Sequence, residues 1–118
     1  MTVVTSGCYN DRYFFEASGH AVSEDKRLVC GGEADGTGEE NLACAAASIL
    51  VLTAVEKIER MQSEGAFLSS SVTVEPGHAE FDLEVREERE EELSIIFDTL
   101  LLGFELLEEN YPDCVSVR

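Results

Sequence analysis

Residues 41–50 read NLACAAASIL, and they decide the fold of the chain. Asparagine is a frequent N-cap, and the alanine and leucine residues after it have high helix propensity, so a helix is predicted from Asn41 to about residue 62. Its first half is apolar on nearly every side, as in a helix that lies deep in a core. The charged residues within 56–60 put one side of its second half in water. The stretch therefore predicts a central helix against which the rest of the chain packs.

Strand patterns lie on both sides of this helix. Residues 3–7 and 13–17 are predicted to form two short strands, and residues 69–75 and 79–85 a hairpin that turns at Pro76-Gly77. In the last of these strands apolar residues alternate with acidic ones, which is typical of a strand with one buried face. The chain therefore supplies one pair of strands before the helix and one pair after it.

A second long helix is predicted over residues 89–110, with acidic residues at its start, where the helix dipole favours carboxylates. Tyr111-Pro112 ends this helix, and residues 114–117 can add a last short strand. The predicted order is ββαββα(β), an α+β fold with two helices packed on one mostly antiparallel sheet. At 118 residues the chain has room for a single domain, 1–118.

The segment between the second strand and the first helix has no periodicity. Residues 22–40 are rich in glycine and in acidic residues, and we interpret them as a loop insertion in the domain. A loop of this length in a small domain is usually functional or disordered. It contains one cysteine, Cys30.

The net charge of −17, from 8 basic and 25 acidic residues, narrows the choice of partners. Such a chain repels nucleic acid and anionic lipid and attracts basic proteins. The first residues, MTVVTSGCYN, lack the basic and apolar regions of a signal peptide, and the longest apolar run, 42–55, is too short to span a bilayer. We therefore expect a cytoplasmic protein that contacts neither membrane nor nucleic acid directly.

Cys44 is the first candidate for chemistry. The four cysteines form no CxxC pair and have no histidine at zinc-ligand spacing, so neither a structural zinc site nor a cofactor is predicted. Cys44, however, falls at N3 of the predicted helix, where unpaired N–H groups stabilise a thiolate and can hold an oxyanion. Ala45 leaves the backbone near the sulfur uncrowded, and Ser48 shares the face of Cys44 one turn later. Core packing is the simpler explanation for a cysteine at this place.

A catalytic cysteine needs a base, and the chain has two histidines. His20 follows Gly19 just past the second predicted strand, where a flexible loop can carry it to the start of the helix. His78 lies at a turn before a strand. A surface histidine without a catalytic role is the simpler explanation for either, and His20 is the better candidate of the two.

These residues resemble the ribosomal-processing cysteine protease family, Prp. Residues 18–21, SGHA, and residues 44–48, CAAAS, are similar to the family's Gly-His-Ala and Cys-Ala-(small)-(small)-Ser motifs, and residues 99–113 resemble its C-terminal helix and exit. The resemblance implies that Cys44 and His20 form a protease dyad. It implies a basic substrate, large-subunit ribosomal protein twenty-seven, whose N-terminal extension is removed during ribosome maturation. It also implies a homodimer.

Two features depart from the family pattern. Asn41 stands where the family has aspartate, and an asparagine can also orient an imidazole. His20 and Cys44 are further apart than is usual in the family, and by spacing alone Cys30 fits the nucleophile better. The sequence after each cysteine favours Cys44, because Gly31-Gly32 cannot open a helix.

The predicted site therefore has a nucleophile, a base, an orienting residue and three supporting residues: Cys44, His20, Asn41, and then Gly19, Ala45 and Ser48. The rival interpretation is a catalytically impaired relative that serves as a ribosome-assembly or protein-interaction module.

Overall fold

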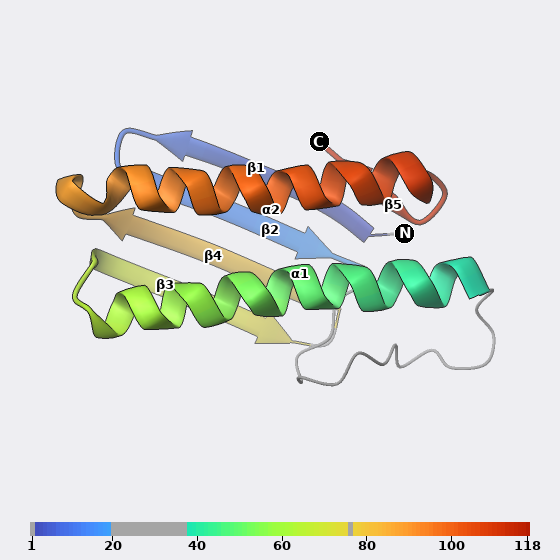
Figure 1. Ribbon diagram of the computed structural model, residues 1–118, viewed down its shortest axis with the longest axis horizontal. Coiled ribbons are helices and arrows are strands. Elements are labelled where there is room, and N and C mark those ends of the chain that lie inside the picture. Colours follow the sequence, from blue (N-terminus) through green and yellow to red (C-terminus); the bar gives the residue numbers. More distant parts are fainter. Residues whose placement is uncertain (1, 20–37, 76) are drawn as a thin grey trace.

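The computed structural model describes residues 2–19, 38–75 and 77–118, with only the backbone of residues 38–41 (Figure 1). The elements follow one another as ββαββαβ, which confirms the predicted order. They are β1 (Thr2–Tyr9), β2 (Arg12–Ser18), α1 (Gly38–Ser63), β3 (Phe67–Glu75), β4 (His78–Val85), the 3-10 helix η2 (Glu87–Arg89), α2 (Glu90–Asn110) and β5 (Val115–Val117).

The strands form one five-stranded sheet in the order β3-β4-β2-β1-β5. All neighbouring strands are antiparallel except β1 and β5, which are parallel. In the centre of the sheet Phe15 of β2 lies opposite Phe81 of β4. At the edge, the N–H of Thr2 donates to the carbonyl of Cys114 at 2.8 Å and the N–H of Arg118 donates to Val4 at 2.8 Å. The two ends of the described chain are thus joined in the sheet.

Both helices cover the same face of the sheet, and no helix of the described residues lies on the opposite face, which we call the open face (Figure 1). Side chains alternate along a strand, so every second residue of β2 and β4 points into the layer between sheet and helices. Phe15 and Phe81 stack there with ring centres 5.1 Å apart, and Phe104 of α2 lies 5.8 Å from Phe15. The fold is therefore a two-layer α+β domain, as predicted.

The two helices lie side by side and are linked by a close approach and by ion pairs. A Cβ atom added at Gly103 of α2 would come within 2.7 Å of a methyl carbon of Leu50 on α1, so the absence of a side chain permits this contact. Lys57 of α1 pairs with Glu92 of α2 at 3.1 Å, and Arg89 pairs with both Glu92 and Glu64 at 2.7 Å. These contacts fix the relative position of α1 and α2.

Helix α1 begins at Gly38, so the prediction that Asn41 is its N-cap is wrong. Asn41 lies within the helix, whose first turn is formed by residues 38–41. The sequence of these residues explains the difference, because acidic residue types are favoured in the first turn of a helix and positions 39 and 40 are glutamates. What was interpreted as the end of an acidic loop is the beginning of the helix.

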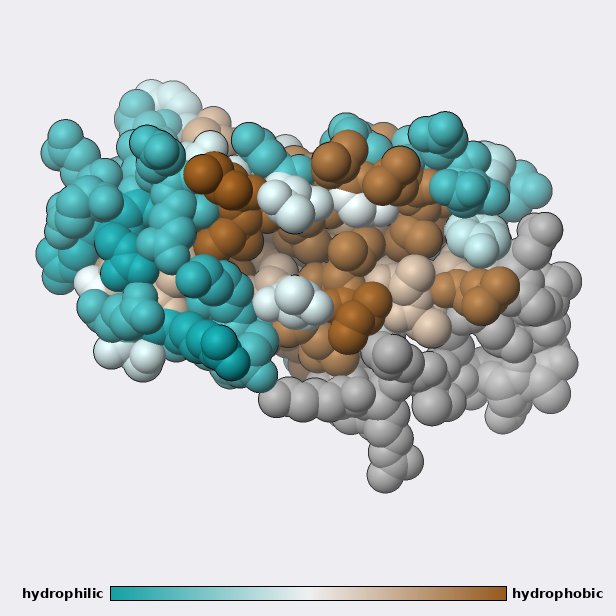
Figure 2. Space-filling model, in the orientation of Figure 1, coloured by the Kyte–Doolittle hydropathy of each residue, from teal (hydrophilic) through white to brown (hydrophobic). Residues whose placement is uncertain are grey.

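The outer surface of the helix pair is unusually apolar (Figure 2). Ile49 of α1 and Ile95 and Leu102 of α2 have 46%, 58% and 55% of their surface exposed. A cleft of about 470 Å³ runs between the helices, and it is lined by Ile49, Leu50, Thr53, Ala54, Lys57, Ile95, Ile96, Thr99 and Leu100. Among the described residues, no helix is both long and apolar enough to cross a membrane.

Candidate active site

Cys44 lies in the second turn of α1, on the side of the helix that faces the sheet. Its side chain is 3% exposed, and its neighbours on this side, Ala43 and Ala47, are fully buried. Ala45 is half-buried, so the helix surface next to the cysteine is formed by a small side chain. Ser48 lies one turn further along the same side and is buried as well. The structure therefore places four of the six predicted site residues on α1: Cys44, Ala45 and Ser48, and the backbone of Asn41.

The position of Cys44 in the second turn changes what the helix can contribute. The N–H groups without an intrahelical partner belong to the first four residues, 38–41, and the field of the helix end fades within the first turn. The expectation that Cys44 occupies N3 is therefore wrong. A thiolate at Cys44 gains less from the helix end than a residue at N3 would, so it depends more on a neighbouring base for its formation.

The sulfur of Cys44 is part of a disulfide in this structure, whereas Cys8 and Cys114 are thiols. A sulfur in a disulfide cannot attack a carbonyl, because the thiolate is the nucleophile. The structure therefore shows an oxidised form, and reduction must precede any chemistry at Cys44. The fourth cysteine, Cys30, lies outside the described residues.

The predicted base, His20, also lies outside the described residues, and of Asn41 the backbone alone is described. The structure does describe Gly19, the residue before His20. Gly19 has φ 130°, a conformation that favours glycine, and its N–H donates to the carbonyl of Gly77 at 2.8 Å. The chain is thus fixed to the turn between β3 and β4 at the point where it leaves β2.

The second histidine, His78, is directed away from Cys44. It lies opposite Ser18 in the β2–β4 ladder, and its neighbour Ala79 is fully buried on the helix side of the sheet. Because successive side chains of a strand alternate between faces, His78 lies on the open face, and α1 covers the other one. His78 is instead paired with Glu16 at 3.7 Å. This arrangement argues against His78 as the base for Cys44.

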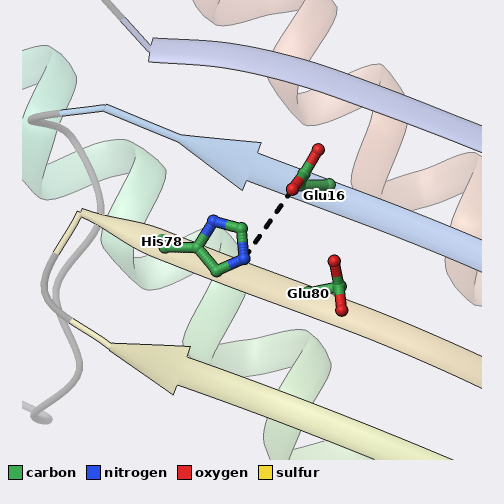
Figure 3. Close-up of side chains that lie close together, drawn as sticks. All are labelled: Glu16, His78 and Glu80. Atoms are coloured by element: carbon green, nitrogen blue, oxygen red, sulfur yellow. Dashed lines mark ion pairs between the residues drawn. The ribbon is translucent and has the colours of Figure 1, made fainter.

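Sequence reasoning missed one group of side chains on the open face. Glu16 of β2 and His78 and Glu80 of β4 lie close together there (Figure 3). Glu16 and Glu80 occupy alternating positions of predicted strands, and His78 was predicted in the turn before the second of them, although β4 begins at His78. Alternation alone does not predict the group, because it does not determine that β2 pairs with β4.

The fold and Cys44 together define the class of the protein: a two-layer α+β domain with a candidate nucleophilic cysteine in the helix after the second strand. The family described as Cysteine protease Prp matches residues 1–116. The chain belongs to this family and is a cysteine protease. No curated protein matches the chain.

Solved structures with the same fold are similar over the whole chain. SMU.848 from Streptococcus mutans shares 23% identity with a TM-score of 0.71, and the match covers 100% of this chain and 92% of that one. The essential ribosomal processing protease Prp from S. aureus, in complex with a substrate peptide, shares 15% identity with a TM-score of 0.67, covering 100% and 98%. The same protease with a covalently linked product peptide shares 19% identity with a TM-score of 0.64, and the match covers 100% of this chain and 98% of that one. At these identities the likeness shows the fold.

Proposed function

We propose that the protein is a ribosomal processing endopeptidase that removes the N-terminal extension of a basic large-subunit ribosomal protein, ribosomal protein twenty-seven. The observation that carries the proposal is the match of residues 1–116 to the cysteine protease Prp family. The S. aureus protease of similar fold, which is described as a ribosomal processing protease, adds support. The net charge of −17 suits a basic substrate. In this proposal residues 1–118 form one domain with a loop insertion that starts at about residue 22 and ends where α1 begins at Gly38.

The proposed chemistry uses Cys44 as nucleophile and His20 as base. After reduction of the disulfide, the imidazole takes the thiol proton and the sulfur attacks the carbonyl carbon of the scissile bond. The imidazolium then returns its proton to the leaving amine, and a thioester remains on Cys44. Water attacks this thioester with the imidazole again as base, which restores the thiol and releases the new carboxylate. Asn41 orients the imidazole, and Gly19, Ala45 and Ser48 support the site.

Three features of the described structure support this assignment. Cys44 is flanked on α1 by the small side chains of Ala43, Ala45 and Ala47. The hydrogen bond from Gly19 to Gly77 holds the backbone at the residue immediately before His20. His78 is paired with Glu16 on the other face of the sheet, which favours His20 as the base.

We also propose that the protein is cytoplasmic and acts as a homodimer. The exposed apolar surface of the helix pair supports the dimer, since exposed apolar patches of this kind commonly mark protein interfaces. Ile95 and Leu102, separated by two helical turns, lie on this surface. Ile95→Glu with Leu102→Glu is expected to yield a monomer in light scattering after gel filtration. Leu68→Glu, at a residue that is 54% exposed on β3, is the matched control and should leave the dimer intact.

Incubation with the extended ribosomal protein tests the proposed activity directly. The reduced enzyme is expected to produce one new N-terminus, identified by mass spectrometry, and Cys44→Ala is expected to produce none. A reduced, folded enzyme that binds the extended protein without cutting it would instead favour the catalytically impaired relative. Cleavage of other basic proteins at equal rate would show a protease with a different substrate.

A further inference from the structure

We propose that Glu16, His78 and Glu80 form a binding site for a divalent transition-metal ion of the Zn²⁺ type. The site lies on the open face of the sheet, and it joins β2 to β4 at the end where the chain leaves for Gly19 (Figure 3). It is separated from Cys44 by the sheet itself. The proposal concerns ion binding at this place and is independent of the protease reaction.

The backbone ladder brings the three side chains to one side of the sheet. Glu16 lies directly opposite Glu80, and Ser18 lies directly opposite His78, two residues along each strand. Residues two apart on a strand share a face, and directly opposite residues have Cβ atoms about 5 Å apart. The positions of the donors are therefore set by regular strand pairing.

The donor atoms are nearly at the spacing that one ion requires. His78 Nε2 and Glu16 Oε2 are 3.7 Å apart, and the donor atoms of all three residues lie within 4.8 Å of one another. Two ligands of one tetrahedral zinc ion, bound at about 2.1 Å, are separated by about 3.4 Å. Side-chain rotations that move the carboxylate oxygens by about 1 Å would close the set, and water can occupy the fourth position.

The charge around the three residues also favours a cation. Glu16 and Glu80 form a rung of like charge, which is destabilising in a sheet. Among the described residues, His78 is the partner of Glu16 and no ion pair involves Glu80. Glu75, opposite His78 on β3, adds a further carboxylate to this face. Arg12 on the same strand lies four residues from Glu16 and is paired with Asp82 at 3.6 Å, so it does not neutralise the rung.

The identity of the ion follows from the donors. An imidazole nitrogen with two carboxylate oxygens suits zinc and its first-row neighbours, whereas Mg²⁺ prefers oxygen ligands alone. Each donor has a distinct part: His78 selects a transition metal, and the two carboxylates neutralise its charge. The bound ion would replace the Glu16–His78 ion pair by one bond to Glu16 of β2 and two bonds to His78 and Glu80 of β4, so that it links the two strands.

Zinc titration of the reduced full chain tests the proposal. Calorimetry should show a site that Glu80→Gln weakens about 10-fold or more, because one of three protein ligands is lost. Glu84→Gln removes the same charge from the same face of β4 and should leave the affinity nearly unchanged. Mg²⁺ should not compete. Zinc should also raise the melting temperature of the wild type more than that of His78→Gln.

The imidazole provides a second readout that does not depend on activity. The chain has two histidines, so His20→Gln leaves His78 as the one source of imidazole NMR signals. In this variant zinc is expected to shift the ring nitrogen signals of His78. Unchanged ring signals at zinc saturation would overturn the proposal and point to the thiols as the ligands. Equal weakening by Glu80→Gln and Glu84→Gln would overturn it in favour of diffuse attraction to an acidic surface.

Discussion

The N–H of Gly19 donates to the carbonyl of Gly77 at 2.8 Å, which ties the residue before His20 to the turn between β3 and β4. The two residues belong to the two Gly-His-Ala repeats of the chain, 19–21 and 77–79. Each glycine has a positive φ, 130° and 81°. The backbone at this junction therefore depends on glycine, and the base proposed for catalysis lies one residue beyond it.

Gly77→Ala is expected to lower both stability and turnover. A residue with a side chain at φ +81° costs about 1 kcal/mol, and the added Cβ would lie 3.5 Å from the carbonyl oxygen of Gly19, an ordinary contact. Gly65→Ala is the matched control, since Gly65 has φ +76° and open space around it. Thermal unfolding should show similar losses for both variants, and kcat should fall for Gly77→Ala alone. Equal kcat in the two variants would show that the junction does not position the base.

Activity is expected to require reduction of the Cys44 disulfide. Without a thiol reductant the enzyme should be inactive and should resist labelling at Cys44 by iodoacetamide. After reduction, iodoacetamide should label Cys44, and activity should be lost at the same rate as this label is incorporated. Cys8→Ala and Cys114→Ala should retain cleavage, because both cysteines are thiols in the oxidised form. Full activity of the unreduced enzyme, or of Cys44→Ala, would contradict the assignment of the nucleophile.

Asn41→Ala is expected to reduce turnover without a loss of stability. Since α1 begins at Gly38, Asn41 is not its N-cap, and the cost of about 1 kcal/mol for removing a cap does not apply. An orienting role for His20 predicts a fall in kcat of about 10²-fold. Asn41→Asp, with the residue that the family has, should stay active. Unfolding midpoints and kcat, measured together, separate the roles: lost stability with normal kcat would show a structural residue.

The acidity of the protein should accelerate its encounter with a basic substrate. We expect kcat/KM for a full-length basic ribosomal protein to fall several-fold between about 0.05 and 0.5 M salt, since electrostatic steering is screened. A short uncharged peptide across the same bond should change little. An equal salt dependence of kcat/KM for the two substrates would show that the net charge of −17 does not steer the substrate and serves solubility.

Glu92→Gln is expected to destabilise the helix pair at neutral pH but not at acidic pH. Hydrogen bonds from Arg89, and then from Lys57, hold the pKa of Glu92 below the usual 4.5. A carboxylate whose pKa is lowered by folding stabilises the folded state at pH values above its usual pKa. This contribution is lost as the pH falls through the lowered pKa. The difference from wild type should be at most about 1 kcal/mol at pH 7, because the pairs are partly exposed. Urea unfolding at pH 7 and at about pH 3 measures it, with Glu91→Gln as the control.

The elements could be predicted from the sequence because their signals are local. Alternation marked β4, Pro76-Gly77 marked the turn between β3 and β4, and the apolar run after Asn41 marked α1. These elements were therefore placed to within a few residues. The start of α1 was missed because positions 39 and 40 continue the composition of the acidic loop. The strand order could not be predicted from local alternation of apolar and polar residues, since the pairing of β2 with β4 joins residues far apart in the chain. For the same reason the group of Glu16, His78 and Glu80 was not foreseen.

The pairing of β5 with β1 has a consequence for folding during synthesis. Strand β1 is the first to be synthesised, yet its outer neighbour is Val115–Val117. The hairpins β1–β2 and β3–β4 can form while the chain is still growing, because their contacts are short in sequence. One edge of β1 stays uncovered until residue 117 has been made, and an uncovered edge invites pairing with other chains. A chain truncated by only a few residues would keep Cys44 but lack the strand that covers this edge of β1.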